Sequence, residues 1–280
     1  MSFLRPLPQA LRAEAARIGG LAARCLVLEV ETWPKPGLVS HVDNGSHTDM
    51  DAGSFRRSAA AIEPFLARLA LAGIEGASMP RLRAIGLEAE GAMLRATGGV
   101  NTHRGAIFGL GLLCAAAGAR LAGARGRLGD VVERLWGEEI LGTPSAPDSH
   151  GGCAARRHGA GGARQEAAAG FPTLYHTGLP ALRQGARLAP GDDEAARVQS
   201  CFALIATLGD TNLLHRGGAE GLAFAQRAAR GFLEGGGVGR PGWRAAAAGI
   251  GADFVARRLS PGGSADLLAM SLFLRAMEAA

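Results

Sequence analysis

Apolar residues recur every three or four positions through most of the chain, which is the spacing of one face of an α-helix. Residues 8–32 show the pattern clearly, and it ends there because Pro34 and Pro36 cannot continue a helix. Aromatic residues make up only 5% of the chain and runs of β-branched residues are rare, which disfavours strands. The pattern predicts an all-α fold in a single domain over residues 1–280. Further helices are expected over residues 52–72, 81–96, 106–117, 127–141, 174–187, 192–208, 219–233, 243–258 and 267–277.

One of these helices, over residues 106–117, is apolar on nearly every side, so we expect it to be buried at the centre of a multi-helix bundle. The turn before it is polar, and Asn101 or Thr102 is suited to cap it. His103 and Arg104 add an imidazole and a guanidinium beside the free amides of the first turn. Such a helix start is suited to bind an anion. Capping alone, with Arg104 in water, would explain the same residues.

The chain is basic, with a formal net charge of +5, and Lys35 is the only lysine among its 30 basic residues. A basic balance suits either nucleic acid or phosphorylated small molecules. The arginines are dispersed, and no run alternates basic with aromatic residues, so a nucleic-acid groove is disfavoured. Small-molecule nucleotides are the expected partners. The sequence is equally compatible with a monomer and a homodimer.

The four cysteines lie far apart and form no Cys-x-x-Cys pair, which indicates neither a zinc site nor a disulfide framework. The longest apolar run, residues 105–119, is too short to span a bilayer. Residues 1–23 lack the apolar core of a signal peptide. We therefore expect a cytoplasmic protein with no membrane partner.

An irregular polar segment, residues 33–51, separates the first two expected helices. Apolar residues within it would anchor it, so we expect it to be ordered and functional. Asp49 and Asp51 precede a helix, where each is suited either to cap it or to hold Mg²⁺, which takes one or two carboxylates with water and phosphate oxygens. Zinc is disfavoured because no suitable His or Cys spacing is present. The polar residues of this segment are Lys35, His41, Asp43, Asn44, His47, Asp49 and Asp51.

Two carboxylates, Glu29 and Glu31, lie at the C-terminal end of the first expected helix. The helix dipole disfavours negative charge at this end. Both residues are therefore expected to have a partner, such as a metal or a base-bearing ligand, unless they are simply exposed to water.

A second polar turn, residues 209–218, resembles the turn before the central helix in its chemistry, because it offers Asn212, a His215-Arg216 pair and glycine. It predicts a second anion-binding corner, with Asp210 as a candidate metal ligand. Near the C-terminus, Ser264 is expected to cap the last helix, and Asp266 suits its first turn.

A segment rich in Gly, Pro, Ser, Arg and His, residues 142–162, has no apolar period and is expected to be a mobile surface loop or lid. The chain contains neither a P-loop nor a Gly-x-Gly-x-x-Gly turn after a strand, so the common nucleotide-binding folds are disfavoured. From the residues alone, the sequence indicates an all-α enzyme that acts on a polyphosphate substrate.

Six motifs occur along the chain, from the end of the first expected helix to the C-terminus. They are Pro34-Lys-Pro-Gly-Leu-Val39, Ser46-His-Thr-Asp-Met50, Gly99-Val-Asn-Thr-His-Arg-Gly-Ala-Ile-Phe108, Arg164-Gln-Glu-Ala-Ala-Ala-Gly-Phe-Pro172, Gly209-Asp-Thr-Asn212 and Gly262-Gly-Ser-Ala-Asp-Leu-Leu268. Together they resemble the triphosphoribosyl-dephospho-CoA synthase family, in the order in which the family carries them. Two variants, Glu29-Val-Glu-Thr-Trp-Pro34 and Ser40-His-Val-Asp43, resemble the malonate decarboxylase branch more than the citrate lyase branch.

The resemblance implies an enzyme that joins ATP to 3'-dephospho-CoA and releases adenine. The product would be 2'-(5''-triphosphoribosyl)-3'-dephospho-CoA, the precursor of an acyl-carrier-protein prosthetic group. Cleavage of the N-glycosidic bond passes through an oxocarbenium-like centre, which carboxylates stabilise, and departing adenine needs a proton. Two alternatives stay open: a metal-dependent N-glycosidic hydrolase of a nucleotide, and a nucleotide-binding adaptor without enzymatic activity.

For this reaction we predict three sets of site residues. Glu29, Glu31 and His103 are the expected catalytic residues, which handle protons and the ribosyl cation. Asp49 and Asp210 are the expected Mg²⁺ ligands. The expected substrate-binding residues, which include the triphosphate contacts, are Lys35, His47, Asn101, Thr102, Arg104, Asn212 and Arg216.

Overall fold

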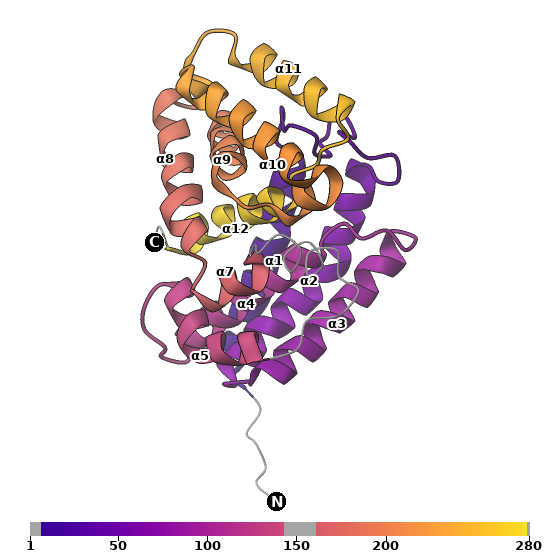
Figure 1. The fold of residues 1–280 in the computed structure, drawn as a ribbon. Coiled ribbons are helices and arrows are strands. Elements are labelled where there is room, and N and C mark those ends of the chain that lie inside the picture. The colour runs from indigo at the N-terminus through magenta and orange to yellow at the C-terminus, as the bar shows by residue number, and fades with distance from the viewer. Residues whose placement is uncertain (1–6, 143–160, 279–280) are drawn as a thin grey trace, which may run out of the picture.

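The computed structural model describes residues 7–142 and 161–278, and the regular secondary structure in those ranges is entirely helical (Figure 1). The all-α prediction is confirmed. The mobile loop predicted for residues 142–162 lies almost wholly outside the described residues. The elements are α1 (Gln9–Val30), α2 (Ala52–Ile74), α3 (Met79–Ala96), α4 (Arg104–Leu121), α5 (Leu128–Gly142), α7 (Gly162–Ala168), the π-helix η1 (Leu174–Gly178), α8 (Leu179–Leu188), α9 (Asp193–Thr207), α10 (Thr211–Glu234), the 3₁₀-helix η2 (Gly237–Gly239), α11 (Trp243–Ala256) and α12 (Gly262–Glu278).

Helix α4 lies at the centre of the bundle, as its pattern predicts. It is buried on all sides over most of its length and packs against α1, α2, α3, α5, α7 and α12. Glycines let α4 approach α2 closely. A Cβ atom at Gly73 of α2 would lie 1.9 Å from the carbonyl oxygen of Ala115 in α4, and a Cβ atom at Gly118 of α4 would lie 1.9 Å from the carbonyl oxygen of Ala70 in α2. By length and composition α4 is the one described helix that could cross a membrane, but 72% of it is buried inside the protein.

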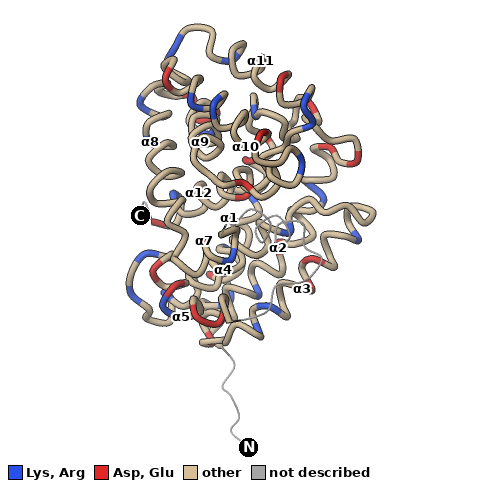
Figure 2. Tube along the Cα trace, in the orientation of Figure 1, with Lys and Arg blue, Asp and Glu red and all other residues tan. Residues whose placement is uncertain are grey.

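Helices α1 to α5 form one end of the molecule and α8 to α11 the other, while α12 runs between them (Figure 1). Helix α12 packs on α1, α4 and α9, so it joins the two ends. Buried apolar residues from both ends belong to one hydrophobic core. Charged residues of both signs are spread around the outside of the helices (Figure 2).

Helix α10 begins earlier than the sequence pattern predicts, at Thr211 instead of residue 219. The side chain of Asp210 accepts hydrogen bonds from the first amides of the helix and so starts it there. Gly218, with φ of 61°, interrupts the helical backbone. Most of the predicted polar turn is therefore a short helical segment, and Arg216 lies within it rather than before it.

Candidate active site

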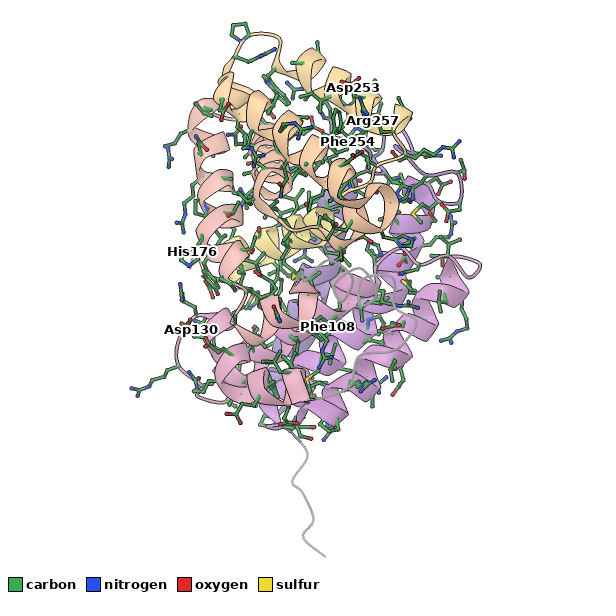
Figure 3. All side chains as sticks on the ribbon, viewed as in Figure 1. Phe108, Asp130, His176, Asp253, Phe254 and Arg257 are labelled. Atoms are coloured by element: carbon green, nitrogen blue, oxygen red, sulfur yellow. The ribbon has the colours of Figure 1, made fainter. Side chains whose placement is uncertain are left out.

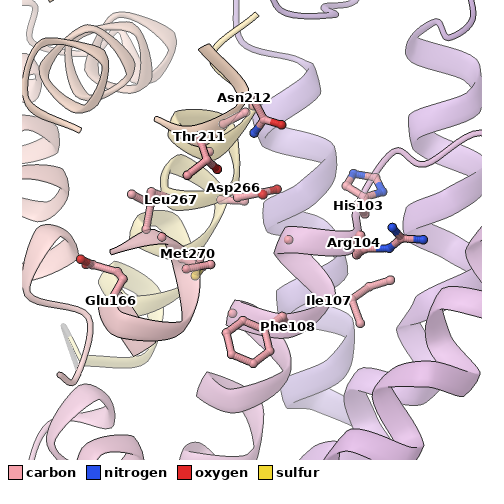
Figure 4. Close-up of a pocket in the computed structure, with 18 of the residues that line it drawn as sticks. His103, Arg104, Ile107, Phe108, Glu166, Thr211, Asn212, Asp266, Leu267 and Met270 are labelled. Carbon is pink, nitrogen blue, oxygen red and sulfur yellow. The ribbon is translucent and has the colours of Figure 1, made fainter. Parts of the chain in front are cut away.

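A cavity of about 1920 Å³ is lined by the starts of α4, α10 and α12 (Figure 4). A pocket for one drug-sized molecule usually measures about 300–1000 Å³, so this cavity has room for two substrates. Segments that are far apart in the chain meet here. The predicted site residues that line the cavity are Glu29, His47, Asp49, Asn101, Thr102, His103, Arg104, Asp210, Asn212 and Arg216.

Glu29 and Lys35 form an ion pair that is buried away from water. Glu29 lies near the end of α1 and lines the cavity, whereas Lys35, from the irregular segment that follows, is not among the lining residues. Burial raises the pKa of Glu29, and the positive charge of Lys35 opposes that shift. Because breaking a buried pair leaves a charge uncompensated, Lys35 holds Glu29 at the cavity wall. The phosphate contact predicted for Lys35 stays a prediction.

Glu31 is not brought to the cavity. It follows the last residue of α1, and its carboxylate lies 3.4 Å from the guanidinium of Arg56 at the surface. Two residues along a helix rotate the side chain by about 200°, so Glu29 and Glu31 point to nearly opposite sides. The sequence predicts a catalytic role for both residues, but only Glu29 lies where a substrate could reach it.

His103 is buried at the start of α4, and only one of its ring nitrogens has a partner. Its Nδ1 atom lies 2.6 Å from Oγ of Ser58, and the hydroxyl of Thr102 donates to the same Oγ over 2.8 Å. Its Nε2 atom is buried and has no hydrogen-bond partner in the described part of the chain. Burial, together with the positive charge of Lys35, lowers the pKa of His103 to about 3. The ring is therefore neutral at neutral pH.

The hydrogen bonds around Ser58 favour one tautomer of His103. Ser58 accepts the proton of Thr102 and can give its own hydroxyl proton to Nδ1 of His103. Nδ1 is then an acceptor and the ring proton is on Nε2. His103 thus places an unpaired N–H donor at the cavity wall, which suits an oxygen of a bound substrate.

Asn101 and Arg104 complete the start of α4. The N-cap position of α4 is His103, not Asn101 or Thr102 as predicted, and its side chain makes no capping hydrogen bond. Oδ1 of Asn101 accepts a hydrogen bond from the backbone amide of Arg104 over 3.1 Å. The guanidinium of Arg104 pairs with Glu90 of α3 at 2.9 Å, and 44% of its side chain is exposed. Exposed pairs of this kind are weak, so an anionic ligand can compete for the guanidinium.

Asp210 is buried and ties the start of α10 to the start of α12. One carboxylate oxygen accepts from the amides of Asn212 and Leu213 at 2.9 and 3.4 Å. The other accepts from the amide and hydroxyl of Ser264 at 2.9 and 3.1 Å. Burial raises the pKa of Asp210, and these four donors oppose the shift. Both oxygens are thus already in use, and the metal role predicted for Asp210 stays a prediction.

His47, Asp49 and Arg216 meet on the α10 side of the cavity. Nε2 of His47 lies 2.8 Å from Oγ of Ser260, and the guanidinium of Arg216 lies 3.3 Å from Nδ1 of His47. The exposed carboxylate of Asp49 lies 3.7 Å from the same Nδ1. Burial and the charge of Arg216 lower the pKa of His47. These contacts fix the irregular segment 33–51 against α10.

Two residues of this site were missed by sequence reasoning. Ser58 of α2 orients His103, but in the sequence it is one more small residue of a helix. Asp266 of α12 lines the cavity and accepts a hydrogen bond from the amide of Ala106 in the first turn of α4. The sequence predicted only that Asp266 suits the first turn of its own helix. The one sequence signal for a role in the site was that Asp266 lies within a family motif.

A metal centre held by protein side chains alone needs several carboxylate, imidazole or thiol groups close together. No group of three or more His, Cys, Asp or Glu side chains in the described ranges is arranged to hold a metal ion. Asp51 is the N-cap of α2, because its side chain accepts from the amide of Ser54 over 2.7 Å. Asp49, with its exposed carboxylate, is the predicted ligand best placed to take Mg²⁺.

Comparison with known proteins gives one family. A family model described as ATP:dephospho-CoA triphosphoribosyl transferase matches residues 15–280. A probable 2-(5''-triphosphoribosyl)-3'-dephosphocoenzyme-A synthase of Stutzerimonas stutzeri is 40% identical over 265 residues, which cover 93% of this chain and 91% of the relative. The synthase of Pectobacterium atrosepticum is 44% identical over 268 residues, 90% of this chain and 86% of the relative.

A third relative, a probable synthase of Pseudomonas aeruginosa, is 40% identical over 287 residues, 100% of this chain and 97% of its own length. No solved structure shows a significant match. The relatives do not separate a malonate decarboxylase branch from a citrate lyase branch. The chain belongs to the ATP:dephospho-CoA triphosphoribosyl transferase family and is an enzyme of the transferase class.

Proposed function

We propose that the protein transfers the triphosphoribosyl group of ATP to 3'-dephospho-CoA and releases adenine. The observation that carries the proposal is the cavity of about 1920 Å³, which collects polar groups from α1, α4, α10 and α12 at one place. Its volume suits two nucleotides bound together, as a transfer between them requires. The family match names the same two substrates.

The triphosphate would be bound at the two helix starts. Arg104 at the start of α4 and Arg216 in α10 supply positive charge, and His103, which is neutral, supplies an uncharged N–H donor. Asn212 and His47 add polar contacts on the α10 side. Preorganised donors of this kind stabilise the charge that develops as a bond breaks.

Glu29 suits the ribosyl centre. As the N-glycosidic bond breaks, positive charge develops on the sugar, and a carboxylate nearby stabilises it. Burial raises the pKa of Glu29, and the positive charge of Lys35 opposes that rise and so favours the carboxylate form. The hydroxyl of the acceptor needs a general base, which contributes roughly 10²–10⁴ to the rate.

Mg²⁺ would fit this site through Asp49. The ion commonly takes one or two protein carboxylates and completes its shell with water and phosphate oxygens. The carboxylate of Asp49 is exposed beside the cavity, whereas both oxygens of Asp210 already accept hydrogen bonds. Bound there, Mg²⁺ would neutralise phosphate charge.

The finer biological role follows from the sequence variants alone. Glu29-Val-Glu-Thr-Trp-Pro34 and Ser40-His-Val-Asp43 favour a product used for the acyl carrier protein of malonate decarboxylase.

We also propose that the enzyme acts in the cytoplasm and that a homodimer is compatible with its function.

The test is to incubate the purified protein with ATP and Mg²⁺, with and without 3'-dephospho-CoA, and to measure free adenine. The proposal predicts adenine only when both substrates are present. Adenine from ATP alone would indicate an N-glycosidic hydrolase, and bound but intact ATP in both samples would indicate an adaptor. Either of these results would contradict the transfer reaction.

A further inference from the structure

Asp266 lies at the point where α12 meets the first turn of α4. A Cβ atom on Gly105 would lie 2.0 Å from Oδ2 of Asp266, so only a glycine at this position lets the carboxyl reach the helix start. The amide of Ala106 donates to the carboxyl. The side chain extends from α12 into the space that faces His103 (Figure 4). Asp266 therefore lines the cavity, and the backbone at the start of α4 fixes the position of its carboxyl group.

Three carboxyl groups gather at this end of the cavity, and their partners differ. Glu29 has the ammonium of Lys35, and Asp210 has four hydrogen-bond donors. Asp266 has one amide donor, and within residues 7–142 and 161–278 no lysine or arginine forms an ion pair with it. One lysine cannot balance three neighbouring negative charges, so a proton is most favourably placed on the carboxyl with the fewest partners.

We propose that Asp266 is the general acid that protonates adenine as it leaves the ribose. This inference rests on the proposed function. Its carboxyl proton moves to a ring nitrogen of adenine while the C1'–N9 bond breaks and its electron pair goes to the base. The hydroxyl oxygen of the second substrate bonds to C1', and its proton passes to a basic group of the cavity. Adenine gains one proton and the acceptor loses one, so none is gained or lost overall.

The electrostatic surroundings keep the proton on Asp266 until it is needed. Burial, followed by the negative charges of Glu29 from α1 and Asp210 at the start of α10, holds the pKa of Asp266 well above its usual range. The amide of Ala106 acts in the opposite direction and is outweighed. His103, at the same helix start, is neutral and cannot supply this proton. A carboxylic acid that stays neutral at neutral pH is suited to general acid catalysis.

The test compares Asp266→Asn with the wild-type enzyme on two substrates. One is ATP, and the other is the 5'-triphosphate of a p-nitrophenyl riboside, whose leaving group departs without a proton. We expect kcat with ATP to fall by roughly 10²–10⁴ with little change in KM, and the rate with the nitrophenyl substrate to stay within about tenfold of wild type. Asp253→Asn, which removes an exposed carboxylate of α11 far from Phe108 in the cavity (Figure 3), is the matched control.

Two further readouts separate acid catalysis from a structural role. The wild-type rate should fall as the pH rises through the pKa of Asp266, and this alkaline limb should be missing in Asp266→Asn. An infrared difference spectrum should show a protonated carboxyl band at neutral pH that is lost in the variant. If the Asn variant did not fold, Asp266→Ser, which removes the carboxyl and leaves a smaller side chain, would replace it.

An equal loss with both substrates, or a loss of less than about tenfold with ATP, would overturn the assignment of Asp266. So would the absence of the infrared band. By contrast, a wild-type protein that releases no adenine from the two natural substrates would contradict the proposed function. The infrared band needs no substrate, so the two failures are distinguishable.

Discussion

The starts of α4 and α10 carry similar residues, but the carboxyl group at each start comes from a different place and has different hydrogen-bond partners. Each lies beside an Asn and a His-Arg pair, and each has a carboxyl at its first amides, buried at α10 and half-buried at α4. At α10 that carboxyl is Asp210, the residue just before the helix, and it accepts four hydrogen bonds. At α4 it is Asp266, which comes from another helix and has one amide donor.

The difference shows that partners, rather than residue type, decide what a buried acid does. Four donors satisfy the carboxylate of Asp210 and make it a joint between two helices. A single donor leaves Asp266 with an unsatisfied charge, so it favours its protonated form. One helix start is therefore a structural connection and the other is a place for chemistry.

The largest expected effect is a difference in stability between variants of Asp210 and Asp266. Asp210→Ala should lower the free energy of unfolding by about 2–4 kcal/mol, because it removes a helix cap and leaves the groups of Ser264 unpaired. Asp266→Ala should lower it by less than about 1 kcal/mol, since only one amide loses its partner. Urea denaturation followed by circular dichroism measures both. Equal losses would show that both helix starts serve the same purpose.

The second prediction concerns His103, which has no buried counterpart at the start of α10. Its lowered pKa means that the unfolded chain takes up a proton below about pH 6.5 while the folded protein does not, down to about pH 3. Stability should therefore fall with decreasing pH in this window, by as much as about 1.4 kcal/mol per pH unit from this group. His103→Asn should show a shallower slope in denaturation measured between pH 7 and 4. An unchanged slope would mean that His103 is charged in the folded protein.

A methyl group at the α4 start should have a moderate effect on activity. Gly105→Ala places a Cβ atom where Oδ2 of Asp266 lies, so we expect adenine release to fall at least about tenfold, the equivalent of 1.4 kcal/mol, while the fold is kept. Gly231→Ala in α10 is the matched control, since nothing lies within 4 Å of its added Cβ. The control should be stabilised by about 0.4–1 kcal/mol and fully active. Normal activity in Gly105→Ala would indicate that the position of Asp266 is unimportant.

The smallest expected difference is in stability, between variants of the two arginines. Arg104→Ala should change the free energy of unfolding by less than about 1 kcal/mol, because its pair with Glu90 is exposed. Arg216 donates to the carbonyls of Ser46 and Arg258, so Arg216→Ala should cost more, about 1–2 kcal/mol. Thermal unfolding of the two variants measures the difference. A larger loss for Arg104 would show that the α4 start depends on its ion pair for stability.

The sequence was sufficient to predict the features that local chemistry determines. The apolar surface of α4 predicted its burial, and the prolines after α1 predicted where that helix ends. The two polar turns were each recognised from their own residues, and residues of both line the cavity. Each of these features depends on residues that are close together in the chain.

What the sequence could not show depends on contacts between distant segments. Ser58 reaches His103 from 45 residues away, and Asp266 reaches Gly105 from another helix, so no local pattern marks either contact. The position of Glu31 away from the cavity has a different cause. Its spacing from Glu29 suggested a pair, but helical rotation sends the two side chains to opposite sides.

The most direct measurement of the central claim is the mass of the product formed from ATP and 3'-dephospho-CoA, together with the amount of adenine released. The account predicts one adduct, dephospho-CoA extended by a triphosphoribosyl group, for each adenine. Adenine accompanied by free ribose triphosphate, with dephospho-CoA unchanged, would show that water is the acceptor and would contradict the account.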